Sequence, residues 1–235
     1  MPERRARGRL PKIDPLPYDV ATACYAIGTP VEVPAGTYLY RQGDTADRIY
    51  CIGAGYAKIT SESPAGHRIV IAFLGPRYTV GVAGMHTPPV YSFNAIAAET
   101  LIAYGWTRAQ AAELIRHPAL RHYLDQVIYH YTEVLATRLH TLSEGLPFER
   151  LAAVLLELAV MHGSSTSGGL VEVDPPVSFE DLGGLSGTTV ETVSRFITQW
   201  REAGVVLPRT DRKKLCLYPE RLRDVVFRDP IPLEA

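Results

Sequence analysis

An amphipathic helix predicted over residues 188–200 is the sequence feature that most constrains the fold of this chain. At about 100° per residue, its apolar side chains gather in one narrow stripe and its polar side chains point the other way. The stripe consists of Val193, Phe196, Ile197 and Trp200. A shorter helix capped by Ser178 comes before it, and the turn 185–187 joins the two. This order is typical of a helix-turn-helix that presents side chains to DNA bases.

The outward side of this helix carries groups suited to reading DNA bases. An arginine can donate two parallel hydrogen bonds to guanine, and a glutamate can accept one from cytosine N4. The predicted DNA-binding residues are Thr189, Glu191, Ser194, Arg195 and Thr198. Two structural interpretations stay open, because Thr188 with Glu191 matches a capping box and Glu191 with Arg195 matches a stabilising ion pair.

A basic hairpin follows the two helices. The short apolar strands predicted at 205–207 and 215–218 flank its tip. The basic side chains of the tip are Arg209, Arg212, Lys213 and Lys214. Residues 187–223 hold eight basic and four acidic side chains, a local charge of +4, whereas the whole chain has a net charge of −1. The hairpin is therefore predicted to be a wing that contacts the DNA backbone.

The N-terminal half has a β pattern. Glycines punctuate short apolar or alternating segments over residues 30–106, and Pro64-Ala65-Gly66 is predicted to be a hairpin turn. No apolar run could span a bilayer and no signal-type stretch follows the N-terminus, so we expect a cytoplasmic protein with no membrane partner. The predicted parts are a mobile basic arm at 1–17, a β-roll effector-sensing domain at 18–117, a dimerisation helix at 118–144 and a winged-helix DNA-binding domain at 145–235.

The helix predicted over 118–144 carries a heptad seam, and Gly145 and Pro147 end it. The seam residues are Leu124, Ile128, Tyr131, Leu135 and Leu142. A seam of about three heptads favours a homodimer, and packing on the chain's own domain is the alternative. Arg138 interrupts the seam, either as a defect or as the point where two chains diverge.

These residues resemble a known family. Residues 178–206 resemble the helix-turn-helix of the CRP/FNR family, the transcription regulators related to the cyclic-AMP receptor protein and the fumarate–nitrate regulator. The run 189–195 resembles the fumarate–nitrate branch, and residues 41–44, 50–59 and 64–68 resemble the family's β-roll and its protruding hairpin. The resemblance implies an α+β protein with a cyclic-nucleotide-binding-like jelly roll, a long dimerisation helix and a C-terminal winged helix-turn-helix.

The resemblance also implies a function. It implies a homodimeric regulator, not an enzyme, that binds double-stranded DNA at a two-fold site like TTGAT-N4-ATCAA and works with RNA polymerase. Glu191, Ser194 and Arg195 match the family's base-reading residues. Gly183-Gly184 departs from the alanine-like residues that the family prefers. Because glycine costs about 1 kcal/mol relative to alanine in a helix, the first helix is expected to be short or mobile.

The effector is expected to differ from cyclic AMP. Val82 stands where the family's ribose-binding glutamate belongs, and residues 88–93 lack its phosphate-binding arginine. A buried phosphate without a charge partner is strongly disfavoured. The predicted pocket is apolar and aromatic, formed by Val82, Met85, Tyr91, Phe93 and Tyr131. The alternative is that these side chains are ordinary core residues.

The sequence does not identify a cofactor. An apolar or aromatic effector and haem are both open, and His67, His86 and His130 are conceivable haem ligands. Three scattered cysteines are too few for a four-cysteine iron–sulfur cluster, and we expect no metal site. Two rival hypotheses are a cupin-type metalloenzyme, which needs clustered histidines and glutamates, and a sensor that acts through protein contacts only.

Overall fold

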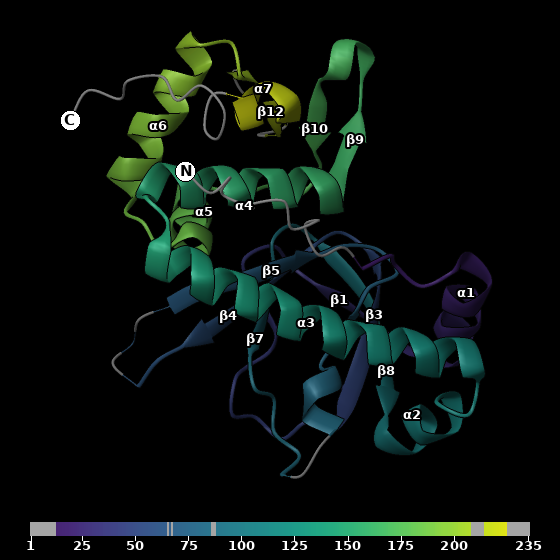
Figure 1. Cartoon of the computed structure of the whole chain (residues 1–235). Helices are drawn as coiled ribbons and strands as arrows, with labels where there is room; N and C mark the ends of the chain where they lie inside the picture. The colour runs from purple at the N-terminus through teal and green to yellow at the C-terminus, as the bar shows by residue number, and fades with distance from the viewer. Residues whose placement is uncertain (1–12, 65, 67, 86–87, 208–213, 225–235) are drawn as a thin grey trace.

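The computed structural model describes residues 13–224 except 65, 67, 86–87 and 208–213. Two antiparallel four-stranded sheets form a β-roll, a long helix crosses the roll, and a smaller winged domain follows that helix (Figure 1). This arrangement confirms the predicted fold class. In the described part of the chain, no helix is both long and apolar enough to cross a membrane.

The β-roll consists of the sheets β1-β8-β3-β6 and β2-β7-β4-β5. The strands are β1 Thr29–Val33, β2 Tyr38–Tyr40, β3 Arg48–Ala54, β4 Ala57–Glu62, β5 Arg68–Leu74, β6 Thr79–Val80, β7 Asn94–Ala97 and β8 Leu101–Thr107. Between β4 and β5, Gly66 takes a φ of +80°, and its N–H donates to Ser63 O at 2.8 Å. Since a positive φ favours glycine, this position explains the predicted hairpin turn, which is confirmed.

The segment before the roll is more ordered than predicted. Ile13 and Leu16 are buried, and Leu16 N donates to Arg77 O at 3.0 Å. The predicted mobile arm therefore ends too late, because its residues 13–17 pack on the roll, while residues 1–12 lie outside the described part. Helix α1 (Tyr18–Ile27) follows, and the Trp106 ring N–H donates to Cys24 O at 2.9 Å to hold it.

Two helices connect the roll to the winged domain. Thr107 and Gln110 form a capping box at the start of α2 (Arg108–Leu114). Helix α3 (Pro118–Glu144) has the predicted bounds, since proline suits a first helical turn. A short 3-10 helix, η1 (Val82–Met85), lies between β6 and β7.

The predicted seam on α3 is rotated in the structure. Leu124 is buried in the roll's core, and Arg138 faces its own chain, where it donates to Val70 O at 3.1 Å and pairs with Glu157. The exposed apolar residues of α3 instead include Ile128, Leu135 and Leu139, the last 71% exposed. With the exposed Thr132, they form a ridge spaced 4-3-4, which we call the α3 ridge. Arg138 is therefore neither a seam defect nor a divergence point. The Leu142 side chain lies outside the described part.

The winged domain packs four helices around a small sheet of order β11-β12-β10-β9. Its elements are α4 Pro147–His162, β9 Gly163–Ser165, η2 Ser167–Gly169, β10 Val171–Val173, α5 Phe179–Ser186, α6 Val190–Glu202, β11 Val206–Leu207, β12 Leu215–Leu217 and α7 Pro219–Arg223. The four residues of the predicted apolar stripe on α6 are all buried in this core. The predicted burial side of α6 is confirmed.

The winged domain's core extends into the β-roll. Val70 and Phe73 of β5 belong to this second core, and α5 lies against β5. A Cβ added to Gly184 would lie 3.0 Å from the Val70 side chain. The two glycines of α5 therefore permit close packing, and α5 is a regular helix of eight residues whose Gly183 and Leu182 are buried. The division at residues 117, 144 and 145 stays a prediction.

Gly183→Ala is expected to destabilise the winged domain by about 1–3 kcal/mol, the range for overpacked sites. Helix propensity alone predicts the opposite sign, because alanine is favoured over glycine by about 1 kcal/mol. A Cβ at position 183 would lie 2.9 Å from the Thr188 backbone oxygen, so the turn must shift. Urea unfolding measures the change, with Ala136→Gly on the exposed side of α3 as the propensity control. A gain in stability for Gly183→Ala would contradict the packing argument.

Candidate nucleic-acid interface and effector cavity

The turn between α5 and α6 is fixed from several sides. Ser178 caps α5 in a capping box with Asp181, and Gly187 ends the helix in a left-handed conformation, φ 62°. The Arg150 guanidinium on α4 donates to Ser186 O at 2.9 Å and to Gly187 O at 3.0 Å. Arg150 also donates to the nearby Gly145 O at 3.2 Å. The sequence carries no local signal for its contacts with the turn, since those two carbonyls lie more than thirty positions away. A turn held this way sets the angle at which α6 leaves the domain.

Helix α6 starts one residue later than the capping-box interpretation requires. Thr189 is the N-cap, and its hydroxyl accepts from Thr192 N at 3.3 Å. The Thr188–Glu191 capping box is therefore wrong, because Glu191 occupies the second position of the helix, not the third. Thr188 instead shares a hydrogen bond with the Ser186 hydroxyl at 2.9 Å.

The outer face of α6 holds the predicted base-reading set. Thr189, Glu191, Ser194, Arg195 and Thr198 are all exposed. Four of them line an open surface groove: Glu191, Ser194, Arg195 and Thr198. In the described residues no ion pair joins Glu191 to Arg195, so the alternative of a stabilising pair gains no support. Both charged groups remain available to a ligand.

Glu191 is held in its ionised form. Hydrogen bonds from its own backbone N–H and from the Thr189 side chain lower the pKa of Glu191. An ionised carboxylate only accepts hydrogen bonds, as contact with a cytosine amino group requires.

The wing is described only in part. Arg209, Arg212 and Lys213 lie outside the described residues. Lys214 pairs with Glu172 at 2.7 Å and with Asp174 at 3.0 Å, both on or beside β10. The hydrogen bonds with these two carboxylates raise the pKa of Lys214. Its charge is thus paired with carboxylates of its own domain, and a contact of Lys214 with the DNA backbone stays a prediction.

A cavity of about 250 Å³ lies between the β-roll and α3. Four of the five predicted pocket residues line it, namely Val82, Tyr91, Phe93 and Tyr131. The Met85 side chain lies outside the described part. The predicted seam residues Ile128 and Leu135 also line the cavity, so α3 closes one side of it.

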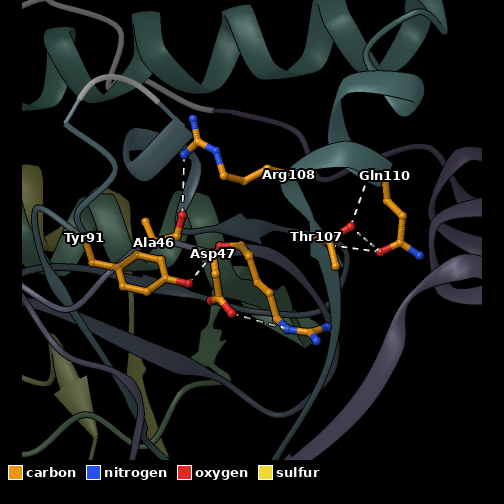
Figure 2. Close-up of polar contacts among 7 residues, drawn as sticks. Ala46, Asp47, Tyr91, Thr107, Arg108 and Gln110 are labelled. Atoms are coloured by element: carbon orange, nitrogen blue, oxygen red, sulfur yellow. Dashed lines mark hydrogen bonds and ion pairs between the residues drawn. The ribbon is translucent and has the colours of Figure 1, made fainter.

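Two stacked tyrosines form part of the cavity wall. The rings of Tyr40 and Tyr91 lie 3.8 Å apart. The Tyr91 hydroxyl donates to Arg48 O at 2.8 Å (Figure 2). Arg108 donates to Ala46 O at 3.4 Å (Figure 2). It also donates to Gly84 O at 2.9 Å, which ties η1 to the turn that holds Ala46. These contacts fix the positions of Tyr91 and η1 beside the cavity.

The cavity's chemistry is neutral. Tyrosine, aliphatic, glycine and hydroxyl side chains line it, and among the described residues none of the lining side chains is charged. Burial raises the pKa of Tyr131 well above the ordinary value for tyrosine. Of the conceivable haem ligands, His67 and His86 lie outside the described residues. His130 lines a separate, much smaller cavity with Glu157 and His162.

Sequence comparisons agree with this geometry. The family description "Cyclic nucleotide-binding domain" matches residues 30–117, and "Crp-like helix-turn-helix domain" matches residues 149–225. The chain is 28% identical to the transcriptional activator protein FnrA of Stutzerimonas stutzeri over 73% of this chain and 70% of the relative. It is 26% identical to the nitrogen fixation regulation protein FixK of Rhizobium meliloti over 81% of this chain and 83% of the relative.

A structural comparison shows the same fold. FixK2 from Bradyrhizobium japonicum superposes with a TM-score of 0.70 at 21% identity, covering 84% of this chain and 96% of that one. Fold and site thus define a DNA-binding regulator with a helix-turn-helix and a cyclic-nucleotide-binding-like domain. The chain belongs to the CRP/FNR family of transcription regulators. It is therefore not an enzyme, and the cupin-type hypothesis is wrong.

Proposed function

We propose that two copies of this chain bind a two-fold DNA site like TTGAT-N4-ATCAA and that an effector other than cyclic AMP controls the binding. The observation that carries this proposal is the outer face of α6, where Glu191, Ser194 and Arg195 are exposed together and free of one another. Half-sites about one helical turn apart suit a dimer with two-fold symmetry. RNA polymerase is a further partner that family membership suggests.

Each copy would read one half-site in the major groove. Arg195 would donate to guanine O6 and N7, and Glu191 would accept from cytosine N4. Ser194 and Thr198 would contact bases or phosphates beside them, and Thr189 would serve at the helix start, where backbone N–H groups attract phosphate. Arg209, Arg212 and Lys213 would contact the DNA backbone from the wing.

Hydroxyl-radical footprinting tests this arrangement on a longer duplex that contains TTGAT-N4-ATCAA. We expect two protected segments related by two-fold symmetry and centred about one helical turn apart. A single protected half-site would contradict the dimer. Uniform protection along the duplex would contradict sequence reading and would leave a sensor that acts through protein contacts.

The homodimer is proposed to form along the α3 ridge. Ile128, Leu135 and Leu139 expose apolar surface at coiled-coil spacing, and Leu135 and Ile128 also close the cavity. This places a dimer contact and an effector site on the same helix. An effector would change the DNA affinity only by binding one arrangement of the dimer better than another.

Leu139→Glu is expected to convert the dimer into a monomer at micromolar concentration, because it would bring two carboxylates together in the apolar contact. Sedimentation measures the change in mass. Gln126→Glu adds the same charge on an exposed part of α3 away from the ridge and should leave the dimer intact. If Leu139→Glu remained a dimer, the α3 ridge would not be the interface.

The effector is proposed to be a neutral apolar or aromatic molecule of one or two rings. An apolar cavity of about 150 Å³ is known to hold benzene, and the present cavity is larger. A cyclic nucleotide would bring its phosphate among lining side chains that, in the described part of the chain, carry no charge, which strongly disfavours its binding. Haem stays open only through histidines beyond the described residues.

The neutral probe 2-naphthol is expected to bind this cavity, and cyclic AMP is not. Calorimetry on the full chain measures both. Ala83→Phe should abolish naphthol binding, because Ala83 lines the cavity yet is exposed, so a larger side chain can fill the space without disturbing the core. Binding of cyclic AMP, or naphthol binding unchanged in Ala83→Phe, would contradict the assignment.

A further inference from the structure

Strand β4 faces the cavity with one residue and the DNA-binding domain with the residue before it. Ile59 lines the cavity. Lys58 points to the other side, as alternation along a strand requires, and its Nζ lies 2.6 Å from Asp181 Oδ1 on α5. The Lys58 side chain is 25% exposed and that of Asp181 only 6%. Two adjacent residues of β4 thus contact the proposed effector cavity and the helix-turn-helix.

Asp181 is also part of the helix-turn-helix framework. Its second carboxylate oxygen, Oδ2, accepts from Ser178 N at 2.9 Å and from the Ser178 hydroxyl at 2.6 Å. One carboxylate therefore caps α5 and binds the β-roll at the same time. The residue that fixes the start of the first DNA-binding helix is held by a lysine from the other domain.

We propose that Lys58 is a positioning residue that ties the helix-turn-helix to the wall of the effector cavity. The idea rests on the proposed function for its biological meaning, but the contact itself does not depend on it. Occupation of the cavity would act on Ile59, and the same strand would pass the displacement through Lys58 to the cap of α5. Helix α6 would then change its angle, because the fixed turn joins it to α5.

The strand next to Lys58 and Ile59 also connects the cavity wall with the winged domain. β4 pairs with β5 along its length, with Lys58 opposite Phe73 and Ile59 opposite Ala72. β5 carries further contacts to the winged domain, Val70 against Gly184 and Phe73 O against His162. A buried ion pair adds little net stability, but removing one partner leaves an uncompensated charge. Its value here is the orientation it imposes.

Hydrogen exchange of the full chain tests the positioning role. Lys58→Met is expected to speed exchange of the α5 amides about ten-fold, whereas Lys58→Arg, which keeps the charge, should leave them protected. Lys214→Met is the matched control, because Lys214 also pairs with carboxylates but only within the winged domain. Equal exchange of α5 in Lys58→Met and wild type would overturn the proposal.

The link to the cavity has its own test. Ile59→Ala removes side-chain atoms from the cavity wall and is expected to change exchange of the α5 amides at least three-fold in the wild-type background. The change should disappear in Lys58→Met, since the connection is then already broken. No effect of Ile59→Ala, or an equal effect in both backgrounds, would overturn the role of β4.

DNA affinity separates a positioning role from a merely structural one. On the TTGAT-N4-ATCAA duplex, at a temperature where all variants are folded, Lys58→Met should change affinity at least five-fold, within the usual range of coupling between sites. Lys58→Arg should stay near the wild-type value. A smaller change for Lys58→Met would overturn the proposal. Failure of the wild type to bind this duplex would count against the proposed function alone, since the exchange measurements decide the contact independently.

Discussion

Arg195→Ala should weaken binding to TTGAT-N4-ATCAA by about 5- to 150-fold per half-site and remove the preference for guanine at one position. A bidentate arginine–guanine contact is worth about 1–3 kcal/mol of discrimination. Arg195 is exposed and contributes no buried side chain to the winged domain's core, so the stability of the protein should change by no more than about 0.5 kcal/mol. Fluorescence anisotropy at one fixed salt concentration measures the affinities, because phosphate contacts make them depend on salt.

Measurements on the specific duplex and on random DNA distinguish a contact of Arg195 with a base from a contact with phosphate. Arg116→Ala removes an exposed arginine that is paired with Glu113 on the β-roll side, and it should leave both affinity and preference unchanged. Equal weakening of Arg195→Ala on the site and on random DNA would mean that Arg195 contacts phosphate. Direct readout of the guanine would then be wrong, although DNA binding itself would stand.

The second large effect is a loss of stability in acid that depends on His162. This residue ends α4, is 8% exposed, and its Nε2 lies 2.7 Å from Phe73 O on the β-roll. Because a carbonyl oxygen only accepts, Nε2 must donate. Burial lowers the pKa of His162 to about 4, although the Phe73 hydrogen bond and the charge of Asp174 act in the opposite direction.

The direction in which stability changes with pH follows from proton binding by His162. With an ordinary pKa of 6.5, the unfolded chain binds a proton that the folded chain binds only near pH 4. Stability is therefore full above about pH 6.5 and falls as the pH drops toward 4, by about 3 kcal/mol at the lower end. Urea unfolding at a series of pH values measures this slope.

His162→Gln should flatten that part of the pH profile, because glutamine can donate to Phe73 O and does not titrate. The exposed His117 provides the matched control, and His117→Gln should keep the wild-type slope. An unchanged slope in His162→Gln would show that other groups cause the acid loss.

Local patterns were enough to predict the elements whose signals are local. Helix α3 has the predicted bounds because Pro118 starts it and the following glycine and proline end it. The burial side of α6 follows from its 3.6-residue period. The order of these signals along the chain also gave the family, which the comparisons confirm.

Sequence patterns fail for side chains whose partners lie far away along the chain. Spacing alone placed Arg138 on the dimer seam, but Val70 O and Glu157 draw it to the other side of α3. Charge counting predicts Lys214 at the DNA backbone, and it does not reveal that Lys214 also pairs with Glu172 on β10 and with Asp174 just after it. In both cases the partners lie elsewhere in the chain, and no pattern beside Arg138 or Lys214 in the sequence indicates them.

Thr188 shows the limit of motif matching at a helix end. Both Thr188 and Thr189 can cap a helix, and a shift of one residue moves Glu191 from the third to the second position. The hydrogen bond between Ser186 and Thr188 decides between them, because it holds Thr188 in the turn. The outer face of α6 tolerates this shift, since both interpretations leave Glu191 and Arg195 pointing outward.

Specific recognition of a two-fold DNA site is the central claim, and a competition titration tests it most directly. The full chain is titrated against TTGAT-N4-ATCAA and against a duplex of the same composition with scrambled half-sites, at physiological salt. We predict binding to the first duplex at least about a thousand-fold tighter, as specific regulators show over non-specific DNA. Equal affinity for the two duplexes would contradict the claim.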